Sequence, residues 1–161
     1  MIAPVKRAQN LFSLSRSELF RILAVMVPAA FLRFFRIGQQ SYWADEVQSI
    51  WQVNGHAGTI FDNIITNFHG PLHFTLLLGW GKIGGWGEVW TRSLSAIAGL
   101  VTIWLFYLLA RKITGRKGAL WAIILLSVSP FHIWYSQEVR NYVFLHLFTI
   151  LSMLIFIRIM E

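Results

Sequence analysis

The 161-residue chain is 56% hydrophobic and 16% aromatic, and only 13% of its residues are charged. This composition is too apolar for an ordinary soluble domain of this size. The formal net charge of +7 does not indicate nucleic-acid binding, because the basic residues lie at the ends of apolar segments, where they orient membrane spans. The lack of cysteine excludes disulfides, thiolate catalysis and cysteine-ligated metals. We therefore expect an all-α, polytopic membrane protein.

The N-terminal region predicts a basic cytoplasmic lead-in over 1–18, followed by a first span over about 19–36. Ser15 and Glu18 match a capping box, in which each residue bonds the other's backbone N–H, so a helix should begin just after Ser15. Near the other end of the span, Arg33 is expected to extend its side chain to the membrane interface.

The next region, about 37–91, predicts a long external loop with juxtamembrane helices. Apolar residues recur at helical spacing in 47–53 and again in 60–68, but neither stretch is long enough to cross a bilayer. The glycine-rich segment 71–87 is ambiguous between a span and an interfacial helix. If it crossed, the basic loop 111–117 would lie outside, against the positive-inside rule. We therefore expect it to stay at the interface.

The remaining sequence predicts three further spans within a transmembrane module that covers 19–161. With the first span, this gives about four in total. It also places both polar loops, 37–91 and the short one before the last span, on the external side. The three later spans are expected over about 93–111, 118–136 and 141–158.

Two adjacent carboxylates, Asp45 and Glu46, follow the first span in the string "YWADE". Asp45 with Gln48 three residues later could simply cap a helix. The alternative is a site residue facing a substrate. Neighbours on a helix point about 100° apart, so the two side chains should not share one target. The residues alone leave both interpretations open.

The string "SPFHIWYSQEVRNY" places Glu138, Arg140 and Tyr142 beside the start of the last span. These residues could form an interfacial ion pair within an aromatic belt. Arg140 is equally suited to bidentate contacts with a phosphate group. Residue types alone do not decide between these interpretations.

A third polar group is "HGPLH", with His69 and His73 four residues apart. Two histidines at this spacing on a helix can ligate a metal, but the pair lacks an HExxH frame. Metal binding is the weaker interpretation, and we assign no metal ligand.

Four strings, taken in order, resemble the N-terminal part of the C-type (GT-C) membrane glycosyltransferases, within the protein mannosyltransferase and aminoarabinose-transferase-like group. Each string alone is weak, but their order and spacing are fairly specific, and together they cover nearly the whole chain. They are "YWADE", "HGPLHFTLL", "EVWTRSLSAIAGL" and "SPFHIWYSQEVRNYVF".

The resemblance implies an inverting enzyme that transfers a sugar from a polyprenyl-phosphate donor to a lipid, protein or glycan acceptor. The transfer would take place on the extracytoplasmic face of the inner (cytoplasmic) membrane. Asp45 would be the carboxylate that binds or deprotonates the acceptor, and Glu46 would help to shape the site. Relatives differ in metal dependence, so a divalent metal is left open as a cofactor. Residues expected to bind donor phosphate or acceptor are Glu138, Arg140, His69 and Tyr142.

Family members are larger than this chain, so we expect a fragment of a longer enzyme, with the missing C-terminal part as a partner beside membrane lipids. No nucleic-acid partner is expected. The alternative function is a non-catalytic membrane module that binds lipid or supports assembly on the same scaffold. A small transporter is a weaker alternative, since no repeat of the spans is visible.

Overall fold

The computed structural model describes residues 14–54 and 71–160, and this part of the chain contains helices and loops without strands. The all-α prediction is therefore confirmed. The expected amphipathic piece at 60–68 lies outside the described residues. The helices are α1 (Arg16–Phe34), α2 (Ala44–Asn54), α4 (Pro71–Gly84), α5 (Glu88–Val128), α6 (Pro130–Ser136) and α7 (Tyr142–Met160).

Helix α1 begins where the sequence predicts. The Ser15 Oγ accepts a hydrogen bond from the Glu18 N–H at 3.2 Å, and the Glu18 carboxylate accepts one from the Ser15 N–H at 3.0 Å. This reciprocal pair satisfies two N–H groups that the first turn leaves without helical partners. The predicted capping box is confirmed.

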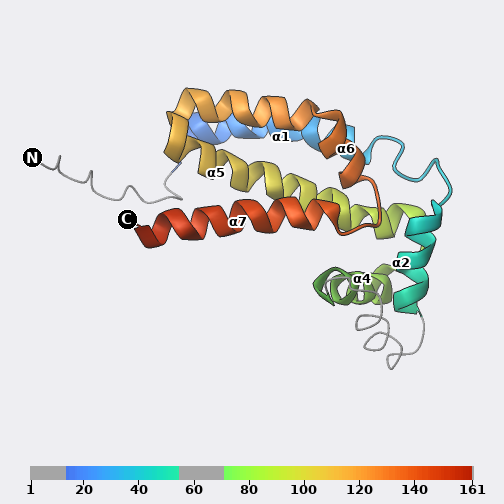
Figure 1. The fold of residues 1–161 in the computed structure, drawn as a ribbon. Helices are drawn as coiled ribbons and strands as arrows, with labels where there is room; N and C mark the ends of the chain where they lie inside the picture. The colour runs from blue at the N-terminus through green and yellow to red at the C-terminus, as the bar shows by residue number, and fades with distance from the viewer. Residues whose placement is uncertain (1–13, 55–70, 161) are drawn as a thin grey trace, which may run out of the picture.

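Helix α5 is two helical arms joined at Gly115. Gly115 has a φ of 75°, in the left-handed region that glycine enters without steric cost. The chain reverses there, so the second arm runs back beside the first toward α6 (Figure 1). The two arms correspond to the second and third predicted spans, with the third completed by α6.

Two helices of the described residues, α5 and α7, are long and apolar enough to cross a membrane, with mean hydropathies of 2.0 and 2.2. Only 17% of the most apolar stretch of α7 is buried within the protein, as expected of a helix surrounded by lipid. Helix α1 carries charged residues at both ends and does not meet the same criterion of length and apolar composition. The expected number of four spans stays a prediction.

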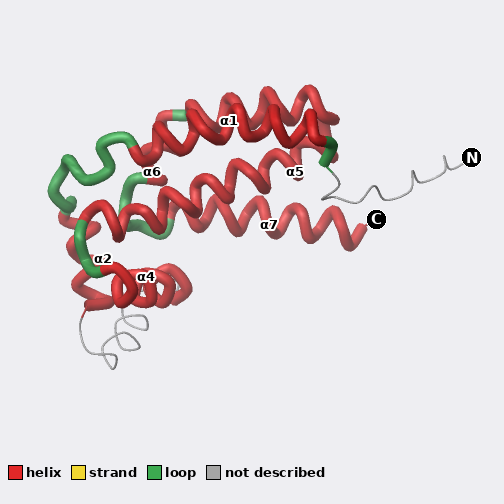
Figure 2. Tube along the Cα trace, turned by 180° about the vertical axis from the view of Figure 1, so that it is seen from behind, coloured by secondary structure: helices red, strands yellow, loops and turns green. Residues whose placement is uncertain are grey.

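The long helices run side by side, and the two polar loops lie at one end of the bundle (Figures 1 and 2). Helices α2 and α4 lie crosswise at that end. Helix α4 has 14 residues and is about 21 Å long, shorter than the hydrocarbon core of about 30 Å. A crosswise position is what an interfacial helix requires. Helix α1 begins and α7 ends at the opposite end.

Arg33 corrects one sequence-based expectation. Its side chain does not extend to the interface but is fully buried between α1 and the start of α6. The guanidinium donates to the Ala29 and Ser127 carbonyls at 2.9 and 3.2 Å and to His132 Nδ1 at 2.7 Å. Three acceptors hold the guanidinium inside the protein. Two of them, Ser127 and His132, are far from Arg33 in the sequence, so they could not be predicted from its position near a helix end.

Gly99 marks a close approach between α5 and α6. A Cβ at this position would overlap the buried side chain of Ser136, and it would also press on Arg33. We expect Gly99→Ala to lower the free energy of unfolding by about 1–3 kcal/mol, as overpacking does elsewhere. Thermal unfolding in detergent tests this. Adding Ser136→Ala should restore part of the loss, and an unchanged midpoint for Gly99→Ala would contradict the close approach.

Candidate functional site

The two polar loops meet through Glu46. The Val139 N–H, in the loop between α6 and α7, donates to Glu46 Oε1 at 2.9 Å. The Trp43 N–H donates to Oε2 of the same carboxylate at 3.1 Å. Trp43 directly precedes α2, so Glu46 reaches back to cap the helix in the manner of a capping-box glutamate. Glu46 therefore makes the cap that was one of the two interpretations of Asp45.

Glu46 also forms a buried ion pair with Arg92, from the first turns of α5. Arg92 Nη2 lies 2.6 Å from Oε2 and Nε lies 2.9 Å from Oε1, a bidentate arrangement. Both side chains are buried. Burial alone would raise the pKa of the Glu46 carboxyl, but the hydrogen bonds from Arg92, Val139 and Trp43 outweigh it and lower the pKa below its ordinary value.

Arg92 fixes the loop that leads from α1 to α2. Its Nη1 donates to the carbonyls of Ile37 and Gln40 at 2.9 and 2.7 Å, and its Nη2 donates to Ser41 at 3.3 Å. One guanidinium therefore holds a carboxylate and three loop carbonyls together. This geometry presents the start of α2, and with it Asp45, at a fixed position beside the second loop.

Asp45 points away from this buried pair. Its side chain is 66% exposed, and Arg140 Nη2 lies 3.8 Å from Oδ2. Arg140 also donates to the Asp45 carbonyl at 3.3 Å. As the helical spacing predicts, the two side chains have different partners: the Glu46 oxygens bind Arg92 and backbone N–H groups, whereas the exposed Asp45 carboxylate lies beside Arg140. Asp45 lines a cavity of about 220 Å³ together with Glu46, Glu138 and Arg140.

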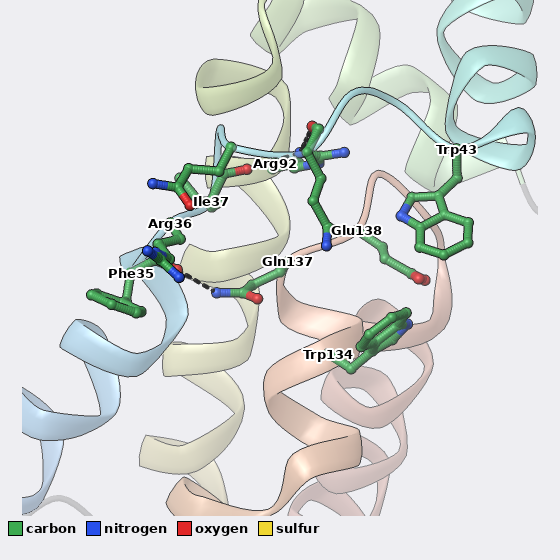
Figure 3. Close-up of a pocket in the computed structure, with 10 residues that line it drawn as sticks. Phe35, Arg36, Ile37, Trp43, Arg92, Trp134, Gln137 and Glu138 are labelled. Atoms are coloured by element: carbon green, nitrogen blue, oxygen red, sulfur yellow. Dashed lines mark hydrogen bonds between the residues drawn. The ribbon is translucent and has the colours of Figure 1, made fainter.

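A second cavity, of about 230 Å³, adjoins the first (Figure 3). Trp43 and Glu138 line both cavities. The rings of Trp43 and Trp134 are 6.0 Å apart and meet edge to face. Figure 3 shows Glu138 directed into the space beside these two rings. Arg36 and Gln137 add polar groups to the same wall, so the two cavities form one polar site with an aromatic surface.

Glu138 differs electrostatically from Glu46. Burial raises the pKa of its carboxyl, and the hydrogen bond from Trp134 only partly offsets this effect. No ion pair with Glu138 exists among the described residues to favour its charged form. The charged form of Glu138 is therefore less favoured than that of an ordinary glutamate.

The remaining predicted site residues are placed as follows. Tyr142 lies beneath Arg140, with the guanidinium carbon 5.7 Å from its ring centroid, and it packs on Tyr135 at 4.9 Å. It therefore supports Arg140 from the start of α7. His69 lies outside the described residues. Within the described ranges, no three His, Asp or Glu side chains converge as a metal site would require.

Arg92 is the site residue that sequence reasoning missed. Its position at the start of a predicted span is equally typical of a basic residue that only marks the end of the span. The signal that could have found it is the run of small polar residues around it, Thr91, Ser93 and Ser95, all of which are buried. Small polar residues in the first turns of an apolar helix indicate a packed position in place of a lipid-facing one.

Together, the helices and the site define an all-α membrane protein that places a polar, aromatic-lined site at one end of its helix bundle. The family model for dolichyl-phosphate-mannose-protein mannosyltransferases matches residues 68–161. The chain therefore belongs to this family of membrane glycosyltransferases. The match includes Arg92, Glu138 and Arg140, whereas Asp45 and Glu46 precede it.

One curated relative matches a longer stretch of the chain, which begins upstream of the family match. An uncharacterized protein of Aquifex aeolicus (strain VF5) is 29% identical over 117 residues, which is 68% of this chain and 23% of the relative. The chain thus spans about a quarter of the length of that relative. No solved structure matches the chain significantly.

Proposed function

We propose that the chain is an inverting glycosyltransferase, or the N-terminal module of one, that transfers a sugar from a polyprenyl-phosphate donor, with Asp45 as the acceptor-binding base. The observation that supports this most strongly is the division between the two adjacent acids. Glu46 is buried and bound on both oxygens, whereas Asp45 is exposed at a cavity beside a cation. An exposed, positioned carboxylate is suited to accept a proton from a hydroxyl group.

In the proposed reaction, Asp45 removes the proton from the acceptor hydroxyl as its oxygen forms a bond to the anomeric carbon. The bond between that carbon and the phosphate oxygen breaks at the same time. Its electron pair leaves with the polyprenyl phosphate, and the anomeric configuration inverts. No covalent enzyme intermediate forms, so a single carboxylate acting as base is sufficient.

The distance of 3.8 Å between Asp45 and Arg140 assigns Arg140 to the acceptor side in this proposal. A sugar ring does not fit between the two side chains, so they cannot flank it from opposite faces. Arg140 then orients Asp45 through this contact and through its hydrogen bond to the Asp45 carbonyl, and it contacts the acceptor. The larger cavity holds the donor sugar against Trp43 and Trp134, with Arg36 as the cation available for phosphate.

A transfer assay tests the proposal. Membranes that contain the protein are supplied with a polyprenyl-phosphate sugar labelled in the sugar, and the linkage of the labelled product is analysed by NMR. We expect label in an extracytoplasmic acceptor with inverted anomeric configuration. A product with retained configuration, or donor that remains intact in these membranes but is consumed when an unrelated transferase is supplied, would contradict the proposal.

A further inference from the structure

Another cavity, about 340 Å³ in volume, lies at the opposite end of the bundle. Its lining residues come from the first turns of α1, from the arm of α5 that follows Gly115 and, through Tyr107, from the arm before it. Figure 1 shows these helices meeting at the end of the bundle where α1 begins. The proposed transfer reaction does not use this cavity. Its wall contains one acid, Glu18, and three cations, Arg21, Arg116 and Lys117.

Glu18 is already committed to other partners. Its Oε2 accepts hydrogen bonds from the Ser15 backbone and side chain at 3.0 and 3.1 Å. Its Oε1 accepts one from the Tyr107 hydroxyl at 3.2 Å and lies 3.1 and 3.4 Å from the Nε atoms of Arg116 and Arg111. This buried carboxylate therefore has no capacity left to neutralise further cations.

Arg21 and Lys117 are exposed at the rim and have no acidic partner within 4 Å among the residues that the structure describes. Arg116 reaches Glu18 through Nε, and its side chain remains 62% exposed. The rim thus has an excess of positive charge with hydrogen-bond donors directed outward. Such a rim attracts an anion, and the residues beside the rim indicate which kind of anionic molecule fits the cavity.

The wall next to this rim is apolar and faces outward. Leu120, Trp121 and Ile124 follow the basic residues along the same arm, toward the middle of the bundle. Trp121 is 66% exposed. The cavity is therefore basic at the end of the bundle and apolar toward its centre, the same order in which a phospholipid presents its headgroup and acyl chain. A small free anion would make no favourable contact with the apolar part of the cavity.

We propose that this cavity binds the headgroup of an anionic phospholipid from the leaflet at this end of the bundle. The phosphodiester accepts hydrogen bonds from Arg21, Lys117 and the outer N–H groups of Arg116. One acyl chain lies along Trp121 and Ile124. Basic pockets between membrane helices commonly recognise anionic headgroups, and a tryptophan at the interface anchors the adjoining chain region.

Lipid binding to the purified, detergent-solubilised protein tests the proposal, with phosphatidylglycerol and phosphatidylcholine of identical acyl chains as probes. We expect a clear preference for phosphatidylglycerol. The double variant Arg21→Gln/Lys117→Gln should weaken its binding by about 30-fold, as expected for two basic residues near an anionic lipid surface. Phosphatidylcholine carries the same phosphodiester but has no net charge, so its binding should weaken less. Arg158→Gln, which removes a cation from the last turn of α7 outside the cavity, should keep the preference.

Two further measurements use the wild-type protein, so they test the proposal even if the double variant folds poorly. In the wild-type protein, added salt should reduce the preference for phosphatidylglycerol, since the contact is electrostatic and exposed. Inorganic phosphate at the same concentration as the lipid should not displace it. Equal affinity for both lipids, a preserved preference in the folded double variant, or displacement by phosphate would overturn the assignment of a lipid site.

Discussion

Glu46→Gln should destabilise the protein by about 3–5 kcal/mol, because it breaks a buried ion pair and leaves the Arg92 charge uncompensated. The pair is bidentate, and Glu46 also accepts the Val139 and Trp43 N–H groups. Removal of this carboxylate therefore loosens both loops at once. The effect is measured as a lower midpoint of thermal unfolding in detergent.

Two comparisons control this measurement. Asp45→Asn removes the same charge one residue earlier from an exposed side chain and should leave the midpoint nearly unchanged. The double variant Glu46→Gln/Arg92→Met should lose less stability than the sum of the two single variants, because it removes both buried charges. Additive losses would show that the two side chains are not coupled.

The stabilisation by Glu46 should also depend on pH in a defined direction. Its pKa is lowered in the folded protein from the ordinary value of 4.5. A depressed pKa stabilises the fold above the unfolded value, and this contribution is lost as the pH falls through the folded pKa. The stability difference between wild type and Glu46→Gln should therefore be full at neutral pH and narrow in acid. A difference that grows in acid would contradict the ion pair.

Asp45→Asn should reduce sugar transfer by about 10²- to 10⁴-fold, the range that a positioned general base contributes. The amide keeps the size of the side chain but cannot accept the acceptor's proton. Among the residues that the structure describes, the only ion-pair contact of Asp45 is with Arg140 at 3.8 Å, and an exposed pair of this kind contributes little to stability. The loss should therefore appear in the transfer rate per folded molecule, measured with a labelled donor.

Glu138→Gln is the matched control for this variant, since it removes the neighbouring carboxylate of the same cavity. We expect a smaller loss that appears mainly in substrate affinity, because Glu138 is assigned to binding and not to proton removal. If Glu138→Gln lost all transfer while Asp45→Asn retained it, the roles of the two acids would have to be exchanged.

Local signals in the sequence predicted the local structure correctly. The capping box at Ser15 predicted the start of α1, and the helical spacing of apolar residues after Asp45 predicted α2. The positive-inside rule placed the two polar loops at the same end, as the contact between Glu46 and Val139 confirms. These signals depend on neighbours in the chain or on the total charge of loops, and both can be read without coordinates.

The long-range pairs could not be read in this way. Arg92 lies 46 positions from Glu46, and Arg33 lies 99 positions from His132. Each arginine stands near the end of an apolar helix, where interface-facing and buried arginines have the same sequence pattern. Which face of the helix packs inward decides between them, and that depends on the tertiary arrangement. For the same reason, sequence suggested Asp45 as the helix cap, whereas the loop geometry gives that role to Glu46.

The central claim is that two adjacent acids have separate tasks: Asp45 acts on the acceptor and Glu46 holds the site together. The most direct test measures the transfer rate per folded molecule and the unfolding midpoint for Asp45→Asn and Glu46→Gln in the same preparation. We expect Asp45→Asn to lose transfer at an unchanged midpoint, whereas Glu46→Gln should lower the midpoint. Wild-type transfer by Asp45→Asn would contradict this claim.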